Sequence, residues 1–152
     1  MTRIYTSATI ERGIEDVFAY VTAPGHWPEW HPSSLDVSGA TDHALDVGEQ
    51  CTEHFRVAGR EGYVVWTVTE RDAPRRWVIA GTIVGGGSGV ITYALTAHDS
   101  GMTSFERTFE YPTPNPLLAL LDTLVLRRRI TAESQEALRR LKARLEASGT
   151  IS

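Results

Sequence analysis

The alternation of hydrophobic and polar residues predicts seven β-strands in this chain. Alternation at a period of two is typical of half-buried strands, and turn residues bound most of the runs. The predicted strands are residues 3–10, 35–38, 49–58, 62–71, 76–84, 90–97 and 102–111. The last six follow one another through short connections, such as the turn at 72–74, so we expect an antiparallel meander.

Two short helices are expected between the first and second strands. Ile14–Val21 carries apolar residues at positions i, i+3, i+4 and i+7, and Glu15 and Asp16 suit the positive end of a helix. The segment 25–32 follows and contains two Trp, two His and two Pro residues. We interpret it as a bent, rigid connection whose indole rings must be buried.

A long helix is predicted over residues 116–147. Asn115 followed by Pro116 is a typical helix start, and no Gly or Pro then occurs before Gly149. At 1.5 Å per residue this helix would be about 45 Å long, so it must lie across the rest of the fold. A strand, short helices, a meander and a long helix together indicate the α+β class.

The two halves of this helix have different hydrophobic patterns. Residues 117–126 are apolar on nearly every side, so they need either a partner chain or a cavity beneath them. We expect a symmetric homodimer through this half. The second half has a narrower apolar stripe, which is typical of a helix with one buried face, formed by Ile130, Ala137, Leu138, Leu141 and Leu145.

Composition limits the classes of function. With 152 residues, one domain spanning 1–152 is expected. The net charge is −4, and the basic residues concentrate in the C-terminal helix, which argues against nucleic-acid binding. The N-terminus has no signal-peptide pattern, and 117–126 is too short to span a bilayer, so we expect a cytoplasmic protein without stable membrane insertion.

Several segments carry a resemblance to a known family. Ile10 and Ile14–Val21 are followed by the Trp-rich stretch at 27–32, by 66–77 and by Gly101–Thr103. In this order they resemble the START/Bet v 1-like superfamily, in particular its polyketide cyclase/dehydrase-like (SRPBCC) branch. The resemblance implies a helix-grip fold, in which a curved antiparallel sheet wraps around the C-terminal helix and encloses an apolar pocket. Members bind lipids, polyketides, hormones or other hydrophobic molecules, and a minority are enzymes; the matching positions are packing and turn residues, not a catalytic signature.

Strand alternation predicts which side chains face the pocket. Side chains of one parity point to the same face of a sheet, and a slip of one residue would invert the assignment. We expect a ligand to be bound by large side chains of the inward parity and by one arginine: Trp30, Phe55, Trp66, Tyr93, Arg107 and Phe109.

The same alternation places Arg107 and Glu53 inside. A buried charge must be paired or solvated. One hypothesis is therefore an Arg107–Glu53 pair, or an arginine that reaches the pocket rim. The other is that Arg107 meets a carboxylate or phenolate of a ligand, which suits its planar fork of donors.

Other chemistry has little support in the sequence. His26 and His31 flank the Trp-rich segment and could act as acid–base groups, although capping the backbone of the loop is the simpler interpretation. No spacing matches a metal-ligand motif, the Gly85–Gly89 run lacks the Lys and helix of a phosphate loop, and the single Cys51 excludes an internal disulfide. We expect no metal and no cofactor, and no catalytic residue can be assigned.

The leading hypothesis is thus binding of a hydrophobic small molecule, lipid-, polyketide- or aromatic-like, in an internal apolar pocket. A second is a polyketide cyclase or dehydratase that uses polar groups of the pocket for acid–base chemistry. A third is an interaction module that docks a partner through residues 117–126.

Overall fold

One curved sheet of seven antiparallel strands forms the body of the protein in the computed structural model, which describes residues 1–57, 59–112 and 119–149. The strands lie in the order β1-β7-β6-β5-β4-β3-β2, so β1 and β2 are the two edges. Their bounds are β1 Thr2–Ile10, β2 Ser34–Gly39, β3 Gln50–Val57, β4 Arg60–Asp72, β5 Arg76–Ile83, β6 Ser88–His98 and β7 Met102–Tyr111. The predicted meander is confirmed: β2 to β7 pair in succession, and β1 pairs with β7.

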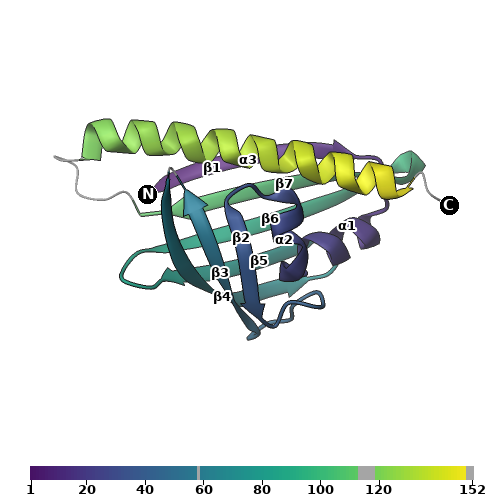
Figure 1. Cartoon of the computed structure of the whole chain (residues 1–152). Coiled ribbons are helices and arrows are strands. Elements are labelled where there is room, and N and C mark those ends of the chain that lie inside the picture. The colour runs from purple at the N-terminus through teal and green to yellow at the C-terminus, as the bar shows by residue number, and fades with distance from the viewer. Residues whose placement is uncertain (58, 113–118, 150–152) are drawn as a thin grey trace.

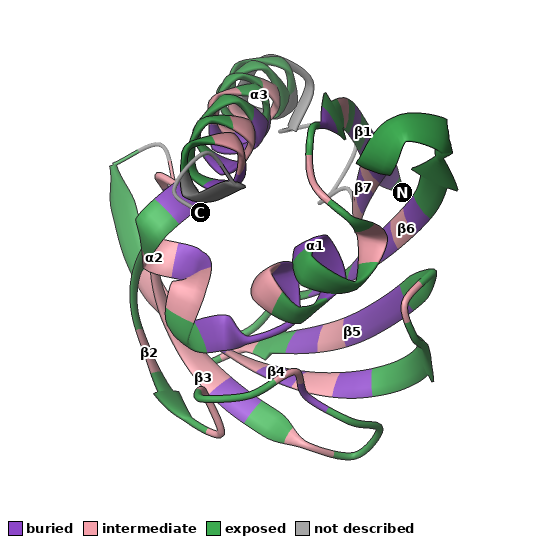
Figure 2. Cartoon of the chain, turned by 90° about the vertical axis from the view of Figure 1, so that its right-hand side faces the viewer, coloured by how far each residue is buried: buried purple, intermediate pink, exposed green. Residues whose placement is uncertain are grey.

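The helices cover one face of this sheet. The helix α1 (Ile14–Val21) and the short helices η1 (Pro24–His26) and α2 (Trp27–Trp30) connect β1 to β2, and η2 (Asp99–Gly101) is a single turn before β7. The long helix α3 (Ala119–Gly149) extends along the whole sheet and contacts β1 and α2 (Figure 1). Figure 2 shows the sheet curving from β2 round to β1, with α3 over the opening between these edges and α1 and α2 filling one end. The predicted helix-grip architecture is confirmed.

The bend of the segment 25–32 is built from the short helices η1 and α2. Pro24 and Pro28 stand where a helix can start with a proline, because the missing N–H would lack a partner there in any case. The indole of Trp27 donates to the carbonyl of Val21 at 2.9 Å, and that of Trp77 donates to the carbonyl of Leu45 at 3.0 Å. Both rings are buried as expected, with their polar atoms satisfied.

The predicted strand register is confirmed. The buried residues of inward parity include Cys51 on β3, Val64, Trp66 and Val68 on β4, Ile91, Tyr93 and Leu95 on β6, and Phe105, Arg107 and Tyr111 on β7. His54, whose parity is opposite to that of Phe55, stacks on Tyr63 and lies 3.1 Å from a carboxylate oxygen of Glu61. On α3, the predicted stripe from Ile130 to Leu145 is buried, together with Ser134.

The first half of α3 differs from the expectation. Leu124 and Val125 are 54% and 58% exposed, although the pattern predicted burial on more than one side. Of the three residues of this half whose burial the structure describes, Leu124 to Leu126, only Leu126 packs, against Ile4, Tyr111 and Ile130, because a single sheet covers only one side of a helix. Asn115, Pro116, Leu117 and Leu118 lie outside the described residues. A homodimer through this half stays a prediction.

Three glycines leave room for aromatic rings to pack against the backbone of the sheet. Gly62 stands directly opposite Phe55, and Gly81 stands directly opposite Trp66. A Cβ atom added at these glycines would lie 2.7 Å from the Phe55 ring and 2.5 Å from the Trp66 ring, and one at Gly89 would lie 2.7 Å from the Phe109 ring. The rings therefore lie over backbone, and they project less toward α3 than they would beside larger neighbours.

Replacing Gly81 by alanine should destabilise the protein by about 1–3 kcal/mol, because the methyl group would overlap the Trp66 ring and Val64. Gly13→Ala is the control, since its added Cβ meets nothing within 4 Å, and only a small effect on the N-cap of α1 is expected. Urea unfolding measures both. Equal stability of the two variants would mean that Trp66 does not rest on Gly81.

The predicted dimer is tested by sedimentation velocity at micromolar concentration, where wild type should sediment as a dimer. Leu124→Glu combined with Val125→Glu should yield a monomer, because charges would then occupy the exposed apolar surface. A wild-type protein that sediments as a monomer would contradict the prediction.

Candidate functional site

A belt of polar side chains crosses the otherwise apolar concave face. Glu53 on β3, Tyr93 on β6 and Arg107 on β7 all have the inward parity, and Arg107 stands directly opposite Tyr93 in the register. The belt divides the apolar lining into two parts. On one side lies the main core with Trp77 and Phe105, and on the other lies the smaller cluster of Ile4, Tyr111 and Ile130.

Arg107 is the one buried guanidinium among the described residues, and it is only 6% exposed. Its Nη1 donates to the hydroxyl of Ser134 on α3 at 3.3 Å, and the guanidinium carbon lies 5.9 Å from the centre of the Phe109 ring. Its Nε has no hydrogen-bond partner. None of the ion pairs formed by the described residues includes Arg107, so its positive charge is not neutralised at contact distance.

The predicted Arg107–Glu53 ion pair is therefore wrong. Glu53 instead accepts a hydrogen bond from the indole Nε1 of Trp66 at 3.0 Å. The two residues lie on strands β3 and β7, which β4, β5 and β6 separate in the sheet. Inward parity places both side chains over the same face, but it does not bring them into contact.

Glu53 lies where its neutral form is favoured. Burial raises the pKa of its carboxyl, while the hydroxyl of Ser34, the indole of Trp66 and the charge of Arg107 act in the opposite direction. The Glu53 side chain is only partly buried by solvent accessibility, although many protein atoms lie around its carboxyl. This combination is expected for a side chain that faces an internal space.

Tyr93 stays a neutral phenol beside Arg107. Burial raises its pKa to about 12, against the opposing effects of the Arg107 charge and hydrogen bond. A neutral phenol can donate or accept a hydrogen bond, but it carries no charge that could neutralise the guanidinium.

His31 also belongs to the belt, and the sequence did not identify it as a binding residue. Its Nδ1 accepts a hydrogen bond from the backbone N–H of Ser33 at 3.1 Å, so it does cap the loop as interpreted. This bond places the ring proton on Nε2, which is buried without a partner. Burial holds the pKa of His31 well below its usual range, and the charges of Arg107 and Arg140 act in the same direction.

Ser134 is a second residue that the sequence analysis missed. A signal was present, because Ser134 interrupts the apolar stripe of α3 between Ile130 and Ala137, at helical spacing from both. A polar residue at such a position must find a partner, and this partner is Arg107.

The six predicted ligand-binding residues are not all in one place. Trp66, Tyr93, Arg107 and Phe109 lie in or beside the belt. Trp30 is buried on α2 next to His31, with ring centres 5.9 Å apart, and its Nε1 has no partner, whereas the other three indoles are bonded. Phe55 stands two residues beyond Glu53 on β3. Their role in binding stays a prediction.

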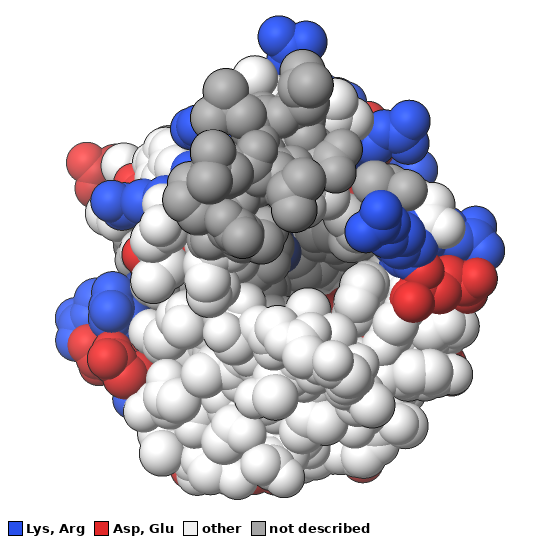
Figure 3. Space-filling view, turned by 90° about the vertical axis from the view of Figure 1, so that its left-hand side faces the viewer, with Lys and Arg blue, Asp and Glu red and all other residues white. Residues whose placement is uncertain are grey.

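The concave lining is most accessible toward the end of the sheet where α3 begins. Phe55, Val57, Ile83 and Phe109 are only partly buried, whereas Ile79 and Phe105 farther along the same strands are closed off. Figure 3 views this end of the molecule, and the surface is hollowed at its centre. An opening there would lead from solvent toward the polar belt.

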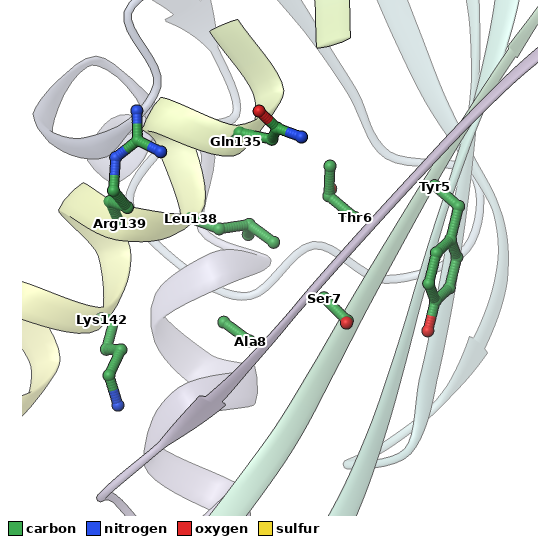
Figure 4. Close-up of a pocket in the computed structure, with 8 residues that line it drawn as sticks. All are labelled: Tyr5, Thr6, Ser7, Ala8, Gln135, Leu138, Arg139 and Lys142. Atoms are coloured by element: carbon green, nitrogen blue, oxygen red, sulfur yellow. The ribbon is translucent and has the colours of Figure 1, made fainter. Parts of the chain in front are cut away.

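A separate groove of about 380 Å³ lies outside this space, between β1 and α3 (Figure 4). Thr6, Ala8 and Leu138 line its floor, Arg139 and Lys142 stand on its helical side, and Tyr5 points away from the helix. These residues include no carboxylate or histidine, so the groove lacks the acid–base groups that the belt contains.

Other chemistry finds no support in the described residues. Burial raises the pKa of the Cys51 thiol to about 12, which leaves it protonated and unreactive. No three His, Cys, Asp or Glu side chains of residues 1–57, 59–112 and 119–149 are grouped to hold a metal ion. Within the same ranges, no helix has the length and apolar character needed to cross a bilayer.

The raised pKa of Glu53 predicts a specific pH dependence of stability. The folded protein holds the Glu53 proton more tightly than the unfolded chain, so this stability is complete below the ordinary pKa of 4.5 and is lost as pH rises through the raised value. Glu53→Gln cannot ionise and should gain stability relative to wild type as pH rises from the ordinary pKa of 4.5 through the raised value. Urea unfolding across this range measures the difference, and Glu106→Gln, on the opposite face of β7, corrects for the loss of one negative charge. A difference that is constant with pH would contradict the assignment.

The fold is shared with solved structures of low sequence identity. A protein from Thermus thermophilus superimposes with a TM-score of 0.77 at 11% identity, over 98% of this chain and 100% of that one. A START superfamily protein from Mycobacterium smegmatis gives 0.65 at 13% identity, over 96% and 98% of the two chains. DynU16, a protein of the dynemicin biosynthetic locus, gives 0.68 at 14% identity, over 96% of this chain and 48% of that one.

The sequence itself matches one family model. No curated protein matches the chain. The family described as "Polyketide cyclase / dehydrase and lipid transport" matches residues 1–146, which include the whole sheet, both N-terminal helices and most of α3. On this match, the chain belongs to the polyketide cyclase/dehydrase and lipid-transport family.

Proposed function

We propose that this protein binds a hydrophobic small molecule, lipid-, polyketide- or aromatic-like, between the concave face of the sheet and α3. The observation that carries the proposal is the apolar lining that stays partly accessible, Phe55 and Phe109 above all. The surface at this end of the sheet is hollowed (Figure 3). Large apolar side chains that line a concave space are the usual walls of a ligand site.

The glycines support this proposal. Phe55, Trp66 and Phe109 lie against Gly62, Gly81 and Gly89, so aromatic rings cover the backbone of the sheet at these three places. Aromatic rings on the concave face offer an apolar wall to a planar or chain-like molecule. The family description, which names polyketide enzymes and lipid transport, agrees with a ligand of this kind.

A second candidate function is an enzyme of the polyketide cyclase or dehydratase type. Glu53, Tyr93 and His31 favour it, because three groups able to exchange protons belong to one belt and electrostatically influence one another or Arg107. Burial moves the pKa of Glu53 upward, toward the range in which a carboxyl group serves as acid or base. Such an enzyme would use the same space as a binding protein.

The binding proposal is tested with Nile red, a neutral dye that fluoresces in apolar surroundings. Wild type should bind the dye, and Ile83→Trp should weaken binding at least about tenfold, because the new ring would fill the accessible end of the concave face. Val84→Trp is the matched control, since Val84 is the next residue and is 68% exposed. Urea unfolding establishes that both variants are folded.

The proposal would be contradicted if wild type failed to bind Nile red. It would also be contradicted if the two tryptophan variants bound the dye equally. For the enzyme alternative, wild type should accelerate deuterium uptake at the central carbon of 1-phenyl-1,3-butanedione, measured by NMR, and Glu53→Gln should abolish this acceleration. A rate equal to that in buffer would exclude proton transfer to this substrate class.

A further inference from the structure

The charge of Arg107 has no counter-ion within the described chain. Its contacts are with neutral groups: the Ser134 hydroxyl at 3.3 Å, the Tyr93 phenol and the face of the Phe109 ring. A guanidinium that is 94% buried without an anion is costly, because burial removes its water without supplying a compensating charge.

The nearby carboxylates do not fill this role. Glu53 is bonded to Trp66 and is held toward its neutral form by burial. Glu133, next to Ser134 on α3, accepts a hydrogen bond from the Ser33 hydroxyl at 2.5 Å instead. Neither forms an ion pair with Arg107, although both stand on elements that face it.

The Nε–H of the Arg107 guanidinium is unpaired among the described residues. Nη1, on the side of the Cδ atom, is bonded to Ser134, whereas Nε on the opposite edge has no partner. The edge that carries Nε also carries an N–H of Nη2, and these two parallel N–H groups fit the two oxygens of a carboxylate. His31 adds a further buried donor, its Nε2–H, close enough for the Arg107 charge to act on it.

We infer that the ligand is an apolar carboxylic acid, whose carboxylate binds the free Nε edge of Arg107 while its apolar body lies along Phe109 and Phe55 toward the accessible end of the sheet. This inference rests on the proposed function, because it places the acid in the same space. It also gives a reason for a polar belt in the middle of an apolar lining. The carboxylate supplies the negative charge that the folded chain lacks, and the ligand lies in one orientation only.

The test compares two probes of nearly the same shape, 2-naphthoic acid and 2-naphthamide, at neutral pH. Each displaces Nile red in competition titrations. Wild type should bind the acid roughly 10- to 100-fold more tightly than the amide, as expected for a hydrogen-bonded ion pair in place of neutral hydrogen bonds.

Variants of Arg107 then show whether Arg107 causes the preference for the acid over the amide. Arg107→Met should lose roughly 10- to 100-fold in affinity for the acid and little for the amide. Its apo form should melt no lower than wild type, because an unpaired buried charge has been replaced by an apolar chain. Arg107→Lys keeps the charge without the planar fork and should keep part of the preference. Arg3→Met, on the exposed side of β1, is the control for the loss of one positive charge.

Glu53→Gln separates the ligand from an internal partner. It should bind the acid as tightly as wild type or more tightly, because it removes a carboxyl that interacts with the Arg107 charge. A wild-type protein that binds the acid no better than the amide would overturn the inference, and so would an Arg107→Met variant that loses both probes equally. If wild type still bound Nile red in that case, the proposed function would stand without the carboxylate inference. If wild type did not bind Nile red at all, the proposed function itself would be contradicted.

Discussion

The packing of α3 across the concave face is the constraint on which the rest of this structure depends. A seven-stranded sheet that curves this strongly exposes an apolar inner face, and α3 covers it at one end, together with α1 and α2, through Ala137, Leu138, Leu141 and Leu145. A fully buried core lies at that end, whereas Phe55 and Phe109 toward the other end stay partly accessible.

The polar belt lies where these two regions meet. In a core formed only for stability, an arginine, a glutamate and a histidine at this depth would be unfavourable, since apolar residues of similar volume pack there at no desolvation cost. The chain nevertheless leaves buried donors of Arg107, His31 and Trp30 without acceptors. Strained or unsatisfied groups of this kind are expected where a protein meets a ligand, and they are the feature that distinguishes this concave face from a closed core.

Fold and family define the space but not its contents. The solved structures share the fold at 11% to 14% identity, and the family description covers both polyketide enzymes and lipid transport. One helix-grip scaffold therefore serves chemically different ligands, and the side chains that select among them must vary. In this chain the candidates are few: the aromatic rings on glycines set the shape of the space, while Arg107, Glu53, Tyr93 and His31 set its polarity.

The sequence by itself determined the order of the elements and the face to which each strand side chain points, because both depend on local periodicity. Trp66, Tyr93 and Arg107 could be placed inside for this reason. Contacts between separate strands depend on the curvature of the sheet and the path of α3, and only the tertiary structure decided them. Glu53 therefore bonds to Trp66 and not to Arg107, and Arg107 meets Ser134 of a helix that no alternation relates to β7. The exposure of Leu124 and Val125 has the same origin, since a helical pattern shows which residues are apolar but not how much of the helix another surface will cover.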